Sequence, residues 1–233
     1  MMTDNSATKD KLNSEAGRFF SYMAGFVRFT PEDEQAIKDT RFIVEKHLPQ
    51  MVGDFYAHLL RYPQTRRFFL KKDGTIDQDY LELRMYHQVN FWRRTASANF
   101  NDEYADFVEY VGKAHTSGGA DPKIYIPERY VIAMVGFVQN AIIQGLQEEL
   151  SEVDPELHMR GVRAWNKLLI VLLEILSRAY GYGRDEESYQ DQVEYDEDAI
   201  KGLSVDLYER ALGIARSIDY HDVLVGRVDE IPE

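Results

Sequence analysis

Apolar residues recur at the spacing of an α-helix through most of the chain, and this periodicity constrains the fold more than any other feature. In residues 15–27, for example, the apolar positions include Ala16, Phe19, Phe20, Met23 and Phe26. No segment stands out as alternating apolar and polar residues in the way a half-buried β-strand does. We therefore predict an all-α fold with seven or eight helices in the main domain.

Capping residues, prolines and glycines divide this periodicity into separate helices. Thr30 precedes Pro31 and a group of acids, which is the pattern of a helix start. Leu48-Pro49 predicts a break, because proline inside a helix removes a hydrogen bond. The expected helices span residues 15–27, 30–46, from the break to 62, 77–95, 101–115, 127–150 and 155–182, with glycines 181 and 183 ending the last one.

The two ends of the chain differ in composition from the helical part. Residues 1–14 are polar and are expected to be disordered. Residues 185–198 contain eight acids and no lysine or arginine, which predicts a solvated acidic linker. Residues 199–217 are amphipathic again and are expected to form a tail helix. The main domain is thus expected at 15–183, followed by the linker and tail at 184–233.

Composition argues against several classes of function. The net charge is −13 and no basic face is apparent, so we expect neither nucleic acid nor membrane as a partner. The absence of cysteine excludes disulfides, iron–sulphur clusters, thiolate zinc sites and thiolate-ligated haem. The N-terminus has no apolar signal core, and the longest apolar run, residues 168–173, is far shorter than the roughly 20 residues of a membrane span. These features favour a soluble cytoplasmic protein.

His115 has the most informative surroundings of the six histidines. It ends a predicted helix and is followed by two glycines, Pro122 and Tyr125. Such a histidine can bind a metal or haem iron through one ring nitrogen, or it can stabilise the end of its helix through the dipole. None of the histidines follows a glutamate by three residues, and no two are spaced for a zinc-binding helix. The 15 tyrosines and 12 phenylalanines would suit a large flat apolar ligand, or simply an aromatic core.

Several segments, taken in order, resemble the protoglobin and globin-coupled sensor branch of the globins. The resemblance covers residues 15–183 and implies a globin fold with an extra N-terminal helix. The matching segments are Phe29–Glu34 (start of the first main helix), Phe55-Tyr56 (the helix-B aromatic pair), residues 63–69, 73–75 and Tyr80-Leu81 (connector and helix E), the spacing of His115, Pro122 and Tyr125 (proximal segment), and Ala164-Trp165 (final helix).

The resemblance implies a haem b cofactor, with His115 as the fifth ligand of its iron. Tyr125 would orient the His115 ring or its loop, unless it is only a loop anchor. Tyr56 would donate a hydrogen bond to the bound gas, unless it is a core aromatic residue.

The resemblance also implies roles for other residues around the haem. His87 and Gln88 are neighbours that point about 100° apart on a helix, so at most one should face the iron. Gln88 is preferred there, and His87 is expected at the pocket edge or in solvent. Phe55, Phe69 and Phe91 would supply the apolar walls of a dry pocket, although each could equally be plain core.

The function implied by the resemblance is reversible binding of O2, CO or NO, for gas sensing, storage or scavenging. Two other interpretations stay open: a haem-free globin-like module that binds a protein partner, and a haem-dependent NO dioxygenase or peroxidase. Whether the chain is an enzyme is therefore undecided. The resemblance further implies a homodimer through the two last long helices, unless their apolar face packs within the monomer. The residues taken to support the dimer are Val131, Val135, Val138, Leu169 and Leu173.

Overall fold

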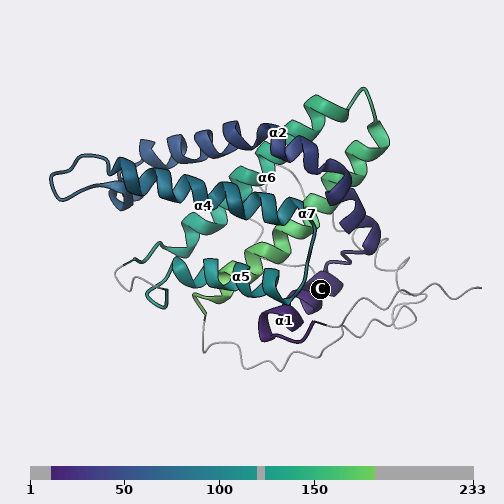
Figure 1. Cartoon of the computed structure of the whole chain (residues 1–233), viewed down its shortest axis with the longest axis horizontal. Coiled ribbons are helices and arrows are strands. Elements are labelled where there is room, and N and C mark those ends of the chain that lie inside the picture. Colours follow the sequence, from purple (N-terminus) through teal and green to yellow (C-terminus); the bar gives the residue numbers. More distant parts are fainter. Residues whose placement is uncertain (1–11, 120–123, 182–233) are drawn as a thin grey trace, which may run out of the picture. The chain divides into compact units, whose positions relative to one another are not determined.

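The computed structural model describes residues 12–119 and 124–181, and within them the chain is helical (Figure 1). The elements are α1 (Glu15–Phe26), α2 (Pro31–Arg61), α3 (Pro63–Arg66), the 3₁₀ turn η1 (Arg67–Phe69), α4 (Gln78–Ala96), α5 (Asp102–Ala114), α6 (Glu128–Leu150) and α7 (Pro155–Arg178). The described residues contain no strand, only an isolated bridge between Leu70 and Ile76. The predicted all-α class is confirmed.

Local capping explains why the helices begin where the sequence predicts. At the start of α2, the backbone N–H of Asp33 donates to the Thr30 hydroxyl, and the Asp33 carboxylate accepts from the N–H of Thr30. This reciprocal pair satisfies two backbone donors that the first helical turn leaves free. Asp77, Asn101 and Asp154 cap α4, α5 and α7 in a similar way, each with a side-chain oxygen.

The predicted break at Pro49 is wrong, because α2 runs without interruption from Pro31 to Arg61. Proline inside a helix costs roughly 3 kcal/mol through its missing N–H and its ring clash. The apolar residues on both sides of it, Leu48, Met51 and Val52, are buried in one core, which favours a continuous helix. Pro49 itself is exposed, so water can reach the carbonyl that lacks a donor.

The core is organised around α7, which packs against α1, α2, α5 and α6. Trp165 lies fully buried on α7, and its indole N–H donates to the Thr40 hydroxyl of α2 over 3.0 Å. Thr40 in turn donates to the carbonyl of Ala36. A large buried ring is therefore satisfied at its one polar atom, which suits the predicted packing role of Trp165.

Two predicted boundaries change and two segments lie outside the described residues. α7 ends at Arg178 rather than at residue 182, since the chain from Ala179 leaves helical hydrogen bonding. Asn13 and Ser14, expected to be disordered, donate their backbone N–H groups to the Asp102 carboxylate. Pro122, the acidic linker and the tail helix at 184–233 lie outside the described residues.

The residues proposed to support a dimer are mostly buried within the subunit. Val131, Val138 and Leu169 belong to its core, which corrects their assignment to an intersubunit face. The large apolar side chains that α6 and α7 expose are instead Ile132, Met159 and Ile170, each about half exposed. The homodimer itself stays a prediction.

Among the described helices, α6 is long and apolar enough to cross a membrane by length and composition alone. In its most apolar window, 28% of the helix is buried inside the chain, and α6 packs against α2 and α7. The same length and composition are found in core helices of soluble proteins. The helix is therefore weak support for a membrane span.

Candidate functional site

The His115 side chain is held with one ring nitrogen committed and the other available. His115 caps the C-terminus of α5, and its Nδ1 lies 2.6 Å from the carbonyl oxygen of Val111, one turn earlier. A carbonyl oxygen can only accept, so Nδ1 must carry the hydrogen and donate it. In the neutral ring, the lone pair is then on Nε2, which has no hydrogen-bond partner among the described residues. This is the tautomer that metal binding through Nε2 requires.

The surroundings of His115 also favour its neutral form. Desolvation by burial is the largest effect and lowers the pKa of the imidazole below its ordinary value of 6.5. The positive charge of Arg84 lowers the pKa further, whereas the hydrogen bond to Val111 acts in the opposite direction. His115 is thus neutral near pH 7, so that no proton occupies Nε2 in place of a metal.

Close packing holds the helix that carries His115. Gly112 lies one turn before it and faces α7, where an added Cβ would come within 2.9 Å of the Leu176 carbonyl oxygen. Only the absence of a side chain allows the two helix backbones to approach this closely. Gly112 therefore sets the distance between α5 and α7.

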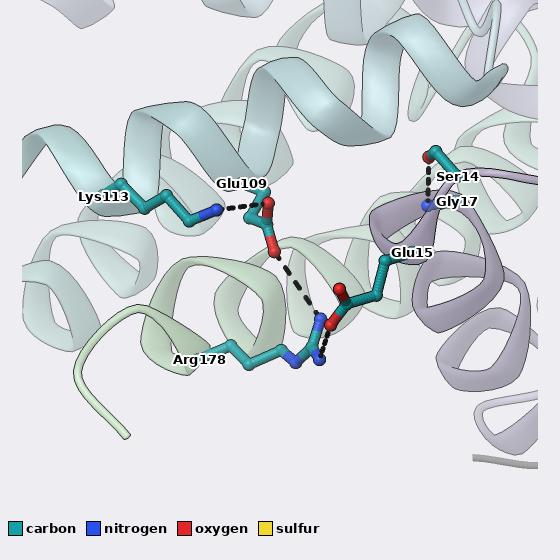
Figure 2. Close-up of polar contacts among 6 residues, drawn as sticks. All are labelled: Ser14, Glu15, Gly17, Glu109, Lys113 and Arg178. Atoms are coloured by element: carbon teal, nitrogen blue, oxygen red, sulfur yellow. Dashed lines mark hydrogen bonds and ion pairs between the residues drawn. The ribbon is translucent and has the colours of Figure 1, made fainter. Parts of the chain in front are cut away.

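Charged side chains add to this packing (Figure 2). Arg178 of α7 lies between Glu15 of α1, at 2.8 Å, and Glu109 of α5, at 3.6 Å. Lys113 contacts the other oxygen of Glu109 at 2.7 Å. The guanidinium of Arg178 also covers the ring of Phe19, with its carbon 4.5 Å from the ring centroid. Three helices therefore meet at one arginine below the His115 helix.

The chain after His115 returns to it through the backbone. The N–H of Ile126 donates to the His115 carbonyl over 2.8 Å, and the Tyr180 hydroxyl donates to the Ile126 carbonyl over 2.6 Å. Tyr125, expected to orient the His115 ring, is 55% exposed, and its ring lies against that of Tyr180. The contact that fixes His115 from this side is thus made by Ile126, with Tyr180 behind it.

Aromatic residues of α2 and the following connector form a second part of the site. Tyr56 is buried and packs edge-on against Phe55 and Phe69, with ring centroids 5.2 and 5.7 Å away. Burial raises the pKa of its phenol well above the ordinary range, so the hydroxyl stays protonated. The hydroxyl makes no hydrogen bond within the described part of the chain, which leaves it available as a donor.

The burial pattern of α4 separates the two residues between which the sequence left a choice. Gln88 is half-buried, on the same face as Met85 and Trp92, whereas His87 is exposed and lies against the ring of Tyr86. Phe91 is buried and contacts Phe107 of α5, at 5.7 Å between centroids. The inward face of α4 therefore carries Gln88 and Phe91 but not His87.

Arg84 belongs to this inward face and was not among the predicted site residues. Its Nε is buried and has no hydrogen-bond partner in the described structure, and its guanidinium carbon lies 4.9 Å from the centroid of the Tyr80 ring. Its charge opposes the rise that burial gives the pKa of Tyr56, and it adds to the lowering of the pKa of His115. The signal was present in the sequence, because Arg84 lies one turn before Gln88 and so shares its face.

The residues around this site fit a haem. A neutral imidazole with a free Nε2 comes from α5, a buried phenol without a partner among the described residues from α2, and an orphaned Arg84 Nε from α4. Phe69 packs against the Tyr56 ring, and Phe91 packs against Phe107 of α5. Such a donor set suits a flat apolar ligand with one metal atom. Elsewhere in the described chain, no group of three or more His, Asp or Glu side chains could hold a metal ion.

Comparison with known proteins agrees with the fold. The protoglobin family model matches residues 18–186. The globin domain of the Geobacter sulfurreducens globin-coupled sensor is similar in structure, with 22% sequence identity and a TM-score of 0.55. The match covers 68% of this chain and 95% of that domain. No curated protein matches the chain. At this identity the structural likeness supports the fold, and the family assignment comes from the sequence match.

Proposed function

Because the chain belongs to the protoglobin family, we propose that it is a haem-binding globin that takes up O2, CO or NO reversibly. When bound, haem b would supply an iron atom that accepts a diatomic gas. His115 would hold that iron through Nε2. The single observation that carries the proposal is the 2.6 Å contact between Nδ1 of His115 and the Val111 carbonyl, since it leaves Nε2 as the free lone pair.

The other residues of the site would shape the pocket around the ligand. Tyr56 offers a protonated hydroxyl with no competing partner in the described structure, which suits a donor to the bound gas. Gln88 lies on the inward face of α4 and offers an amide for the same purpose. Phe69 and Phe91 are buried and would exclude water from the porphyrin. Phe55 packs behind Tyr56 and would fix its ring.

Absorption spectroscopy of the purified full chain tests this proposal. The protein should show a Soret band that shifts when the ferrous form binds CO. His115→Ala should lose the band or bind added hemin only weakly, because it removes the Nε2 lone pair that would hold the iron. His87→Ala is the matched control, since His87 is exposed on the outward side of α4. A wild-type chain that binds no hemin, or a His115→Ala variant with an unchanged spectrum, would contradict the proposal.

A further inference from the structure

The segment that joins α2 to α4 carries a cluster of cations in an otherwise acidic chain. The net charge of the chain is −13, yet five of the twelve residues from 61 to 72 are arginine or lysine. We call these five side chains the basic tip: Arg61, Arg66, Arg67, Lys71 and Lys72. All five are exposed, and they lie at the left-hand end of α2 and α4 in Figure 1.

Backbone hydrogen bonds keep the basic tip compact. The N–H of Arg66 donates to the Tyr62 carbonyl over 2.8 Å, so the chain turns directly after α2. The N–H of Lys71 donates to the Thr75 carbonyl, also over 2.8 Å, and closes the turn that carries Lys72. Between these two turns, α3 and η1 advance by only about 1.5–2.0 Å per residue. The five charges therefore share one end of the helical domain.

No acid among the described residues forms an ion pair with the basic tip. The two acids of the same segment bind other donors: Asp73 accepts from the N–H and the hydroxyl of Thr75, and Asp77 accepts from the N–H of Tyr80. Elsewhere a cation such as Lys167 does contact a carboxylate, at 2.6 Å. The positive charge of the basic tip is thus left for a partner outside the described chain.

Exposed apolar side chains lie among these cations. Tyr62 is 51% exposed and Leu70 is 36% exposed. The guanidinium carbon of Arg67 lies 4.9 Å from the centroid of the Phe68 ring, which supports the arginine from one side. A partner that binds here would therefore cover apolar surface as well as pair with charges.

The acidity of the rest of the chain favours a narrow anionic partner over a broad one. A membrane or a nucleic acid duplex presents an extended negative surface, which would also meet the acidic remainder of the molecule and be repelled by it. Asp79 and Glu82 are exposed at the start of α4, directly after the basic tip, and add to this repulsion. A single acidic peptide strand is narrow enough to contact the basic tip alone.

We propose that the basic tip is a docking surface for an acidic segment of protein. Carboxylates of the segment would pair with the exposed arginine and lysine side chains, and its apolar residues would cover Tyr62 and Leu70. The inference is independent of the haem proposal, because none of the five cations belongs to the candidate haem site. Residues 185–198 of this chain, with eight acids and two tyrosines, provide the sequence of a defined acidic probe.

Fluorescence anisotropy with the full chain tests the inference. The probe is a fluorescein-labelled synthetic peptide with the sequence of residues 185–198, and it should bind the wild type less tightly as salt rises. Neutralising four cations of the basic tip should raise its Kd by about 10- to 100-fold; the variant combines Arg66→Gln, Arg67→Gln, Lys71→Gln and Lys72→Gln. The matched control makes the same change in net charge at four exposed positions elsewhere and should shift the Kd by less than about threefold; it combines Arg93→Gln, Arg129→Gln, Arg160→Gln and Arg163→Gln.

A second chain guards against competition from the protein's own acidic segment. In this full-length variant the eight acids of residues 185–198 are replaced by asparagine or glutamine, and its affinity for the probe should equal or exceed that of the wild type. Far-UV circular dichroism checks that every variant keeps its helices.

Three results would overturn the inference. The first is that neither the wild type nor the variant with the neutral segment binds the probe. The second is equal weakening by the two sets of four substitutions, which would show that only net charge matters. The third is that vesicles of phosphatidylcholine and phosphatidylserine, or single-stranded DNA, bind the basic tip more tightly than the peptide at the same salt, which would assign the surface to another class of polyanion.

Discussion

Replacing Gly112 with alanine tests the packing that positions His115. A Cβ at this position would lie 2.9 Å from the Leu176 carbonyl oxygen, 3.1 Å from its Cα and 3.4 Å from the Ala179 Cβ. Optimal separations between non-bonded carbon atoms are about 3.5–4.0 Å, so the contacts at 2.9 and 3.1 Å are much too short, whereas 3.4 Å is only slightly below that range. Both short contacts are to backbone atoms, which cannot rotate away as a side chain can. The variant must therefore move α5 away from α7.

The magnitude follows from two opposing effects. Overpacking a well-packed core costs about 1–3 kcal/mol, and backbone obstacles favour the upper half of that range. Alanine is a better helix former than glycine by about 1 kcal/mol, which offsets part of the cost. The net destabilisation should be about 1–2 kcal/mol, or a Tm lower by roughly 2–8 °C for a domain of this size.

Gly53→Ala provides the matched control within the same protein. Gly53 is also inside a helix, α2, but no atom lies within 4 Å of its added Cβ. This variant should be more stable than the wild type by about 0.5–1 kcal/mol, because only the helix preference changes. Urea unfolding followed by far-UV circular dichroism measures both variants. If Gly112→Ala gained stability as Gly53→Ala does, the close approach of α5 and α7 would be refuted.

Two further predictions concern the same region. Tyr180→Phe removes the hydroxyl that donates to Ile126 and should lower the unfolding free energy by about 0.5–1.5 kcal/mol in urea titrations. The exposed Tyr125→Phe should stay within about 0.5 kcal/mol of the wild type, and equal losses in both would contradict the role of this hydrogen bond. The pKa of His115 is lower in the folded chain, so the unfolded state binds more protons below about pH 6.5 and the apoprotein should lose stability as the pH falls through this region. Urea titrations between pH 5 and 8 should show a smaller acid loss in His115→Gln, and an identical loss would contradict the desolvation of His115.

Helix starts were predictable because they depend on neighbouring residues. Thr30 and Asn101 cap their helices through side-chain contacts within three residues, and a local sequence pattern contains that information. The continuity of α2 across Pro49 was not predictable in this way. It depends on the burial of Leu48 and Val52 against distant segments, which outweighs the local preference to end the helix.

In the candidate site, too, the features set by neighbouring residues were predictable and those set by three-dimensional contacts were not. His115 could be proposed from its spacing to the following glycines and Tyr125, but its tautomer depends on the geometry of the Val111 carbonyl. The sequence did not indicate that Arg84 belongs to the site, because a charged residue in a polar stretch is usually expected to face solvent. The periodicity of α4 contradicts that assumption, since Gln88, one turn later, is half-buried on the same face.

The position of His115 depends on α7 more than on any other helix. Gly112 rests on the Leu176 backbone, Glu109 meets Arg178, and Ile126 joins the His115 carbonyl to Tyr180. All three partners lie in the last turns of α7 or directly after it, whereas α4 packs against α2. A force on the His115 ring therefore cannot move α5 without moving the end of α7 or breaking these contacts. Ligand binding at a metal held by His115 would therefore act on the end of α7.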